Sequence, residues 1–122
     1  MYADPPRWET DVDRWALKHG EERVISWATY RTRQMHDALE RFLADLAAGR
    51  IAQDGCPLTA RAMANARKLA KASDRYILGK PSQNQKIDPA MTRVLAHEAA
   101  SDARAAGWAA EPAGPAYRRL PR

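Results

Sequence analysis

Cysteine is almost absent from this sequence, and so are long apolar runs. Cys56 is the only thiol, so the chain can form neither an intrachain disulfide nor a cysteine-based zinc site. No stretch approaches the roughly 18 consecutive apolar residues that a membrane span needs. The segment Met1–Pro6 also lacks the basic and then apolar pattern of a signal peptide. These absences predict a soluble protein of a reducing cytoplasm that has no membrane partner.

The chain also has no room for a second full domain and no complete phosphate-binding loop. Its 122 residues fit one small domain, because domains commonly have roughly 100–150 residues. Gly79 and Lys80 match the end of the GxxxxGK[ST] pattern, but the first glycine is missing and Pro81 follows the lysine. The sequence therefore excludes a complete ATP-driven motor of this type.

Positive charge is concentrated in one segment. The whole chain has a net charge of +5, and residues 61–86 alone contain seven lysines and arginines against Asp74, a net charge of +6. A basic stripe of this kind is typical of contact with a phosphate backbone, although a solvated helix face would look the same in the sequence. The predicted nucleic-acid contacts are Arg61, Arg67, Lys68, Lys71, Arg75, Lys80 and Lys86.

Hydrophobic spacing in the first half predicts helices that alternate with a strand. A helix is expected from about Arg7 to Gly20, and a short β-branched and aromatic strand at 24–28. A second helix is expected from Thr32 to Gly49, where the glycine ends it in a left-handed conformation. The apolar stripe of this second helix is formed by Met35, Leu39, Phe42 and Leu46.

The second half predicts two more helices around a strand. An alanine-rich third helix is expected to carry the basic segment on its outer face, and a strand is expected at 76–78. The last helix is expected from Pro89 to Gly107. We therefore expect one domain at 1–108 and a disordered tail, rich in proline and arginine, at 109–122. The apolar stripe of the third helix is formed by Leu58, Ala62, Ala66 and Leu69.

Two aspartates stand at the junctions between expected elements. Asp4 precedes Pro5, and Asp88 precedes Pro89. An aspartate before a proline is an ordinary helix start, so each could serve only as a cap. Carboxylates at the ends of elements in an α/β fold can also meet at one sheet edge and bind Mg²⁺ or Mn²⁺ through their oxygens. The sequence alone leaves both interpretations open.

These residues and their order resemble the C-terminal nuclease region of the large terminase subunits of tailed phages and prophages of actinobacterial type. The resemblance covers roughly 1–108, and the Lys86-Ile87-Asp88 entry into an alanine-rich helix is its most specific piece. Gln53 departs from the pattern, because relatives often have a histidine there. The matching segments are Tyr2-Ala3-Asp4-Pro5-Pro6 with Trp8, Asp13-Arg14-Trp15-Ala16, Thr29, Arg33-Gln34-Met35, the turn from Gly49 to Gly55, Asn65-Ala66 and Lys86-Ile87-Asp88.

The resemblance implies a ribonuclease H-like α/β domain that is truncated here to a short sheet flanked by about four helices. In that family three acidic residues bind magnesium or manganese, and Asp4 and Asp88 match the second and the third by motif position. The first lies upstream of Met1, and the stub before Asp4 is shorter than an ordinary strand of roughly 5–6 residues. The chain is therefore expected to form part of a metal-dependent DNA endonuclease and to be inactive alone.

The resemblance also implies partners. They are double-stranded DNA, the missing N-terminal part of the terminase, and the portal or the small terminase subunit, in the cytoplasm of a bacterial host. Two other functions remain open, namely a non-catalytic basic module for nucleic-acid binding or assembly, and a decayed prophage fragment. Trp8, Trp15 and Trp27 are expected in the core. His36 and His97 are expected at the surface, and Glu98 is a candidate auxiliary carboxylate.

Overall fold

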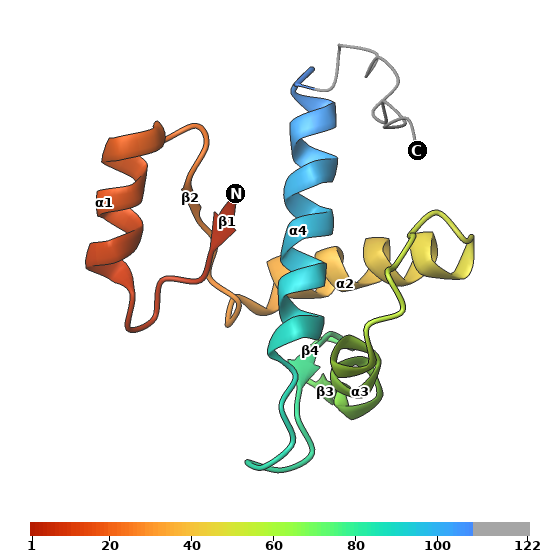
Figure 1. Ribbon diagram of the computed structural model, residues 1–122. Coiled ribbons are helices and arrows are strands. Elements are labelled where there is room, and N and C mark those ends of the chain that lie inside the picture. Colours follow the sequence, from red (N-terminus) through yellow and green to blue (C-terminus); the bar gives the residue numbers. More distant parts are fainter. Residues whose placement is uncertain (109–122) are drawn as a thin grey trace, which may run out of the picture.

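The computed structural model describes residues 1–108, which form a mixed α/β fold (Figure 1). The expected mixture of helices and strands is confirmed over this range, and so is the expected number of four helices. The tail at 109–122, predicted to be disordered, lies outside the described residues. The elements are β1 (Tyr2–Ala3), α1 (Glu9–His19), β2 (Ile25–Ser26), α2 (Thr32–Ala47), α3 (Pro57–Asn65), β3 (Arg67–Ala70), β4 (Tyr76–Gly79) and α4 (Asp88–Ala105).

The described strands form two separate two-stranded sheets, so the prediction of one short sheet was wrong in this respect. β1 and β2 are parallel, with Tyr2 opposite Ile25 and Ala3 opposite Ser26. β3 and β4 form an antiparallel hairpin. β1 packs on α4 whereas β4 packs on α2, so the two sheets rest on different helices and share no edge.

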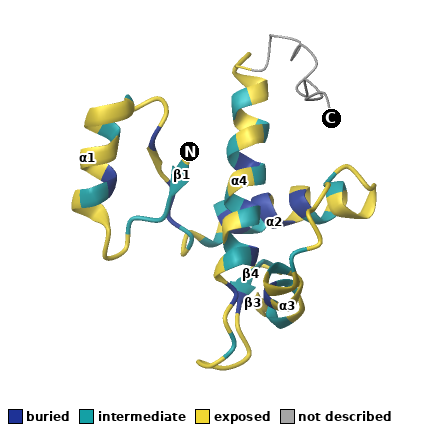
Figure 2. Ribbon diagram, in the orientation of Figure 1, coloured by how far each residue is buried: buried dark blue, intermediate teal, exposed yellow. Residues whose placement is uncertain are grey.

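The core lies where α2 crosses α4, as Figure 2 shows. The predicted stripe of α2 is confirmed for Met35, Leu39 and Phe42, which are at most 4% exposed. Val94 of α4 packs against them. Leu46, the last residue of the stripe, is 39% exposed because the crossing ends before the final turn of α2. The apolar side of α2 therefore organises the fold mainly through its first three turns.

α4 is the longest described helix and contacts α2, α3 and β1. Ala90, Val94 and Glu98 follow at four-residue spacing on its buried side. Glu98 is 4% exposed, and Arg41 of α2 donates to both of its carboxylate oxygens, with Nε 3.0 Å from Oε2. A buried carboxylate needs such a partner because it has lost its water. Neither α4 nor any other described helix is long and apolar enough to cross a bilayer.

The basic segment does not form the long third helix that the alanines predicted. α3 ends at Asn65, Ala66 is extended with φ −62° and ψ 139°, and β3 begins at Arg67. The chain then reverses through Ser73 and Asp74, which have positive φ values of 60° and 54°. Pairing of β3 with β4 gives this segment backbone hydrogen bonds between strands in place of helical ones and overrides its helix propensity.

α1 stands apart from the other helices in Figure 1 and packs on β2. Val12 is its buried residue. Trp8 and Trp15 are 58% and 39% exposed, so the prediction that they lie in the core was wrong. Trp27 is 6% exposed, and the prediction for it is confirmed. Trp8 is the cap of α1 and Trp15 lies on the helix, and among the described elements α1 packs on β2, which leaves both indoles largely uncovered.

We expect Met35→Ala to lower the free energy of unfolding by about 2–5 kcal/mol, because Met35 is fully buried and its truncation leaves a cavity. The control is Leu17→Ala, because Leu17 is 82% exposed and its change should stay within about 0.5 kcal/mol. Urea denaturation followed by circular dichroism measures both. Equal losses in the two variants would contradict the described core.

Candidate metal and nucleic-acid site

Asp4 follows β1 directly, and the parallel pairing of β1 with β2 brings Thr29 beside it. The carboxylate of Asp4 accepts hydrogen bonds from the backbone N–H of Thr29 at 3.1 Å and from its hydroxyl at 2.7 Å. α1 begins only at Glu9, and its cap is Trp8. Asp4 is therefore held by Thr29 in the segment that follows β2 and does not cap the helix that follows it.

Asp88 is the first residue of α4, and the cap position belongs to Ile87. No side-chain hydrogen bond caps this described helix, so the carboxylate of Asp88 is not used for that purpose. The last residue of α3 holds the segment before α4, because the side-chain amide of Asn65 donates to the backbone carbonyl of Lys86 at 3.0 Å. The interpretation of the two aspartates as ordinary caps therefore fits neither position.

Asp4 and Asp88 line the same two hollows, although they are far apart in the sequence. One hollow, of about 430 Å³, also has Lys80 and Lys86 in its wall. The other, of about 740 Å³, includes Trp8. Within residues 1–108 no group of three His, Cys, Asp or Glu side chains is arranged to hold a metal ion. The arrangement therefore offers a cation two carboxylates, with two lysines beside them.

The seven predicted nucleic-acid contacts do not share one helix face. Because the segment folds as a helix followed by a hairpin, its cations are spread over four kinds of local structure. Arg61 lies on α3, Arg67 and Lys68 lie on β3, Lys71 and Arg75 flank the turn of the hairpin, and Lys80 and Lys86 lie on the loop before α4.

The register of the hairpin divides its cations between two faces. Lys71 donates its N–H to the carbonyl of Arg75 at 2.7 Å, which continues the pairing of Leu69 with the opposite strand. Opposed residues share a face and neighbours alternate, so Lys71 and Arg75 share the face of Leu69. Leu69 lines the smaller hollow of the two aspartates. Lys68 belongs to the other face, where its Nζ lies 4.1 Å from the ring centroid of Tyr76.

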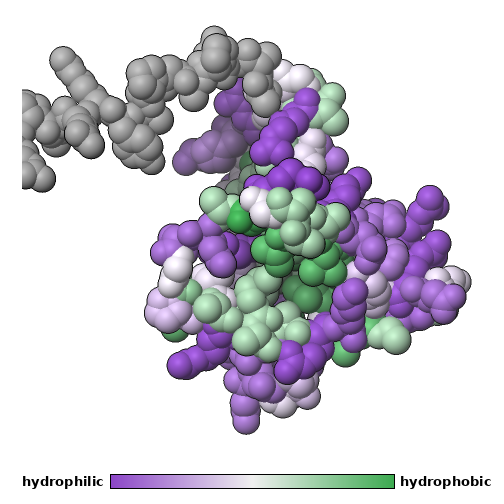
Figure 3. Space-filling model, turned by 90° about the vertical axis from the view of Figure 1, so that its right-hand side faces the viewer, coloured by the Kyte–Doolittle hydropathy of each residue, from purple (hydrophilic) through white to green (hydrophobic). Residues whose placement is uncertain are grey.

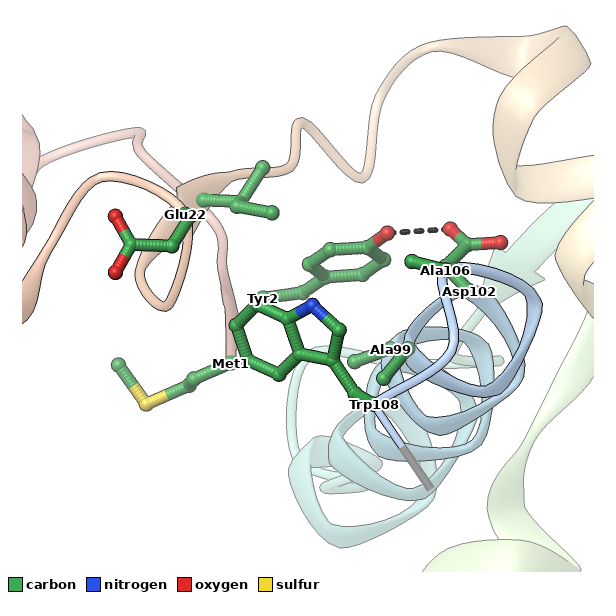
Figure 4. A pocket seen from close by; sticks show the side chains of 9 residues that line it. Met1, Tyr2, Glu22, Ala99, Asp102, Ala106 and Trp108 are labelled. Carbon is green, nitrogen blue, oxygen red and sulfur yellow. Dashed lines mark hydrogen bonds between the residues drawn. The ribbon is translucent and has the colours of Figure 1, made fainter. Parts of the chain in front are cut away.

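Tyr2 ties β1 to the far end of α4. Its hydroxyl points toward Asp102 across a third hollow of about 310 Å³ and donates to that carboxylate (Figure 4). Burial, followed by the bond to Asp102, raises the pKa of Tyr2 to about 12, so the phenol keeps its proton at neutral pH. This anchor holds the strand that presents Asp4. The sequence carried no signal for it, because the two partners are 100 residues apart.

Glu98 does not join the two aspartates. Its carboxylate is held by Arg41, and it lies ten residues along α4 from Asp88. At 1.5 Å per residue this is a separation of about 15 Å along the helix axis. The expectation of an auxiliary carboxylate is therefore wrong, and Glu98 serves the crossing of α2 and α4.

Neither histidine expected at the surface is fully exposed. The side chain of His97 is 13% exposed, and its Nε2 lies 2.7 Å from Oδ2 of Asp45. The Arg50 guanidinium and then His97 hold the pKa of Asp45 below its ordinary value. His36 is partly buried, and its Nδ1 accepts the N–H of Tyr76 at 3.4 Å. Both imidazoles therefore contribute to packing between elements.

Comparisons of the chain with models of known protein families, with curated proteins and with solved structures found no match.

Proposed function

We propose that this chain is the C-terminal half of the ribonuclease H-like nuclease domain of a phage or prophage large terminase, and that it does not cleave DNA alone. The observation that carries the proposal is the convergence of Asp4 and Asp88 on the same two hollows. Both residues stand at the ends of elements, and neither is used as a helix cap. This is the arrangement that metal ligands matching the family's second and third acidic residues would need.

The donor set fits a hard divalent cation. Carboxylate oxygens are the ligands that Mg²⁺ and Mn²⁺ prefer, so Asp4 and Asp88 would hold such an ion. When bound, the ion would offset phosphate charge and lower the pKa of a water molecule. Thr29 holds Asp4 in one orientation through two hydrogen bonds, as outer partners of metal ligands do. Two carboxylates against two divalent ions leave excess positive charge, which supports a need for a third acidic residue.

The cations beside the carboxylates fit the backbone of double-stranded DNA. Lys80 and Lys86 share the smaller hollow with the aspartates, so they can bind a phosphate next to the metal ligands. Lys71 and Arg75 extend this positive surface along one face of the hairpin. Arg67 is already engaged, because its guanidinium donates to the carbonyls that end α3. The proposed DNA contact therefore rests mainly on the hairpin turn and on the loop before α4.

Two alternatives from the sequence stand beside this proposal. A non-catalytic basic module for nucleic-acid binding or assembly is favoured by the lack of an acidic triad within the described residues. In that case Asp4 would serve the fold through Thr29, and the cations alone would act. A decayed prophage fragment would keep the same geometry without a function. Under the first proposal the partners are the rest of the terminase and the portal or small subunit, in a bacterial cytoplasm.

Mn²⁺ should quench the fluorescence of Trp8, because this indole lines a hollow together with both aspartates. We expect saturable quenching in the unchanged chain and its loss in Asp4→Asn and in Asp88→Asn. Trp8→Phe should remove the part of the emission that Mn²⁺ quenches. Asp37→Asn, an equal loss of charge at an exposed position of α2, is the control and should leave the titration unchanged. Equal quenching in all of these proteins would refute a metal site at the two aspartates.

Removal of the two hollow-lining lysines should weaken binding to duplex DNA without sequence preference. For Lys80→Gln with Lys86→Gln, we expect the slope of log K against log salt to fall by about 0.9 for each phosphate that the variant no longer neutralises. Fluorescence anisotropy of a labelled duplex at several salt concentrations measures it. Arg14→Gln with Lys18→Gln on α1 removes the same charge and should change the slope little. If both double variants behave alike, only net charge attracts DNA.

The chain should show little or no DNA cleavage with Mg²⁺ or Mn²⁺, whereas a chain extended at its N-terminus by an acid-bearing strand should cleave. Two carboxylates hold a second metal poorly, and loss of one electrostatic element can lower the rate by on the order of 10²–10³. Supercoiled plasmid in agarose gels provides the assay. Strong metal-dependent cleavage by the 122 residues alone, abolished by Asp88→Ala, would show that the ligand set is already complete.

A further inference from the structure

A cavity of about 210 Å³ opens into the core beside the hairpin, and its described lining shares Leu78 with the smaller hollow of Asp4 and Asp88. Elements α2, α3, α4 and both hairpin strands contribute to its wall, and Figure 3 shows hydrophobic residues gathered between hydrophilic ones on the face where α3 and the end of α2 project. The apolar part of the wall includes Leu39, Phe42, Leu43, Met63, Leu78 and Val94.

The wall belongs to the core itself. Leu39, Phe42 and Val94 are at most 4% exposed, and Ala90 on the same side of α4 is 1% exposed. The small side chain of Ala90 leaves room where a longer one would fill the cavity. An apolar space of roughly 150 Å³ is known to stay dry and to accept benzene, so this one can take a somewhat larger apolar group.

The mouth of the cavity is cationic. Arg67 and Lys68 line it, and no acidic residue appears in its wall within the described part of the chain. Arg67 is held by the carbonyls of Ala64 and Ala66 at 2.6 and 2.9 Å. The hydroxyl of Tyr76 donates a hydrogen bond to the carboxylate of Glu40 on α2. The ammonium of Lys68 lies 4.1 Å from the ring centroid of Tyr76. Arg67 is bound to backbone carbonyls, so Lys68 is the cation of the mouth that an anionic ligand can recruit.

We propose that this cavity binds a small amphipathic carboxylate, with the apolar part in the core and the anionic group at Lys68. Charge complementarity selects this occupant, because an apolar space with a cationic rim matches an acid that carries an alkyl chain or a single aromatic ring. The site is independent of the proposed nuclease function. The hairpin register puts Lys68 on one face, and Lys71 and Arg75 on the other.

The test is a titration of the full chain with octanoate, followed by ¹H–¹⁵N and methyl chemical shifts. We expect saturable shifts centred on Leu39, Met63 and Val94, which line this cavity and neither hollow of the two aspartates. Octanol should bind at least about fivefold more weakly than octanoate, since a hydrogen bond to a charged group adds to affinity. Lys68→Gln should weaken octanoate binding by roughly five- to tenfold and leave octanol binding unchanged. Lys71→Gln is the matched control and should leave octanoate binding within about twofold.

Filling the cavity provides a second, independent arm. Ala90→Leu should abolish binding, and circular dichroism checks that the variant keeps its helices. Leu43→Phe narrows the same space from a partly exposed position and should weaken binding if Ala90→Leu does not fold. Equal affinity for octanol and octanoate, shifts confined to other residues, or binding that survives these filled variants would each overturn the proposal. None of these results depends on metal or DNA.

Discussion

The crossing of α2 and α4, made by apolar packing and by the ion pair between Arg41 and Glu98, is the contact on which the rest of the described fold depends. Glu98 is the buried charged residue of the core, and a carboxylate without water must face its cation. Together with the burial of Ala90 and Val94 on the same side, this requirement constrains the rotation of α4 about its axis. With the helix fixed, Asp88 at its start is presented to the end of β1, and Asp102 near its end is presented to Tyr2.

Both ends of α4 therefore act on the same short strand. Tyr2 is anchored by the end of the helix, and Asp4, two residues later, lies beside the start of the helix. A strand of two residues has few backbone hydrogen bonds of its own, so side-chain anchors largely determine its position. Thr29 adds a second side-chain anchor from the segment after β2. The candidate metal site therefore depends on the distant bond between Tyr2 and Asp102 as well as on the contact of Thr29 with Asp4 itself.

The sequence predicted the helices well where one apolar stripe meets one partner. α2 begins at Thr32 as expected, and Gly49 just beyond its end adopts a left-handed φ of 68°. The prediction from the sequence was wrong at β3, because Ala66 and Leu69 continue the helical spacing of the preceding residues. The segment forms a strand because it pairs with β4. This pairing needs a glycine at position 79, since a side chain there would overlap Leu69. Such a fit is not visible in a pattern of single residues.

The candidate site was predictable only in part, because the sequence shows which residues stand at the junctions of elements but not how residues 67–70 pair. Asp4 and Asp88 were singled out by their junctions, and the structure puts both on the same hollows. The distribution of the cations was not predictable, because it depends on whether residues 67–70 form a helix or a strand. The neighbours Lys68 and Leu69 would lie about 100° apart on a helix, but they lie on opposite faces of the hairpin.

The bond from Tyr2 to Asp102 has a consequence for synthesis on the ribosome. The two residues are 100 positions apart, so the N-terminal strand is made long before its anchor exists. At about 5–20 residues per second, the anchor follows after roughly 5–20 seconds, and then only once it has left the exit tunnel. During that interval β1 can pair with β2, which is close in sequence, and Tyr2 can stack on Trp27, but the pair lacks its bond to α4. The nascent chain therefore exposes a free strand edge that chaperones or a neighbouring nascent chain can bind.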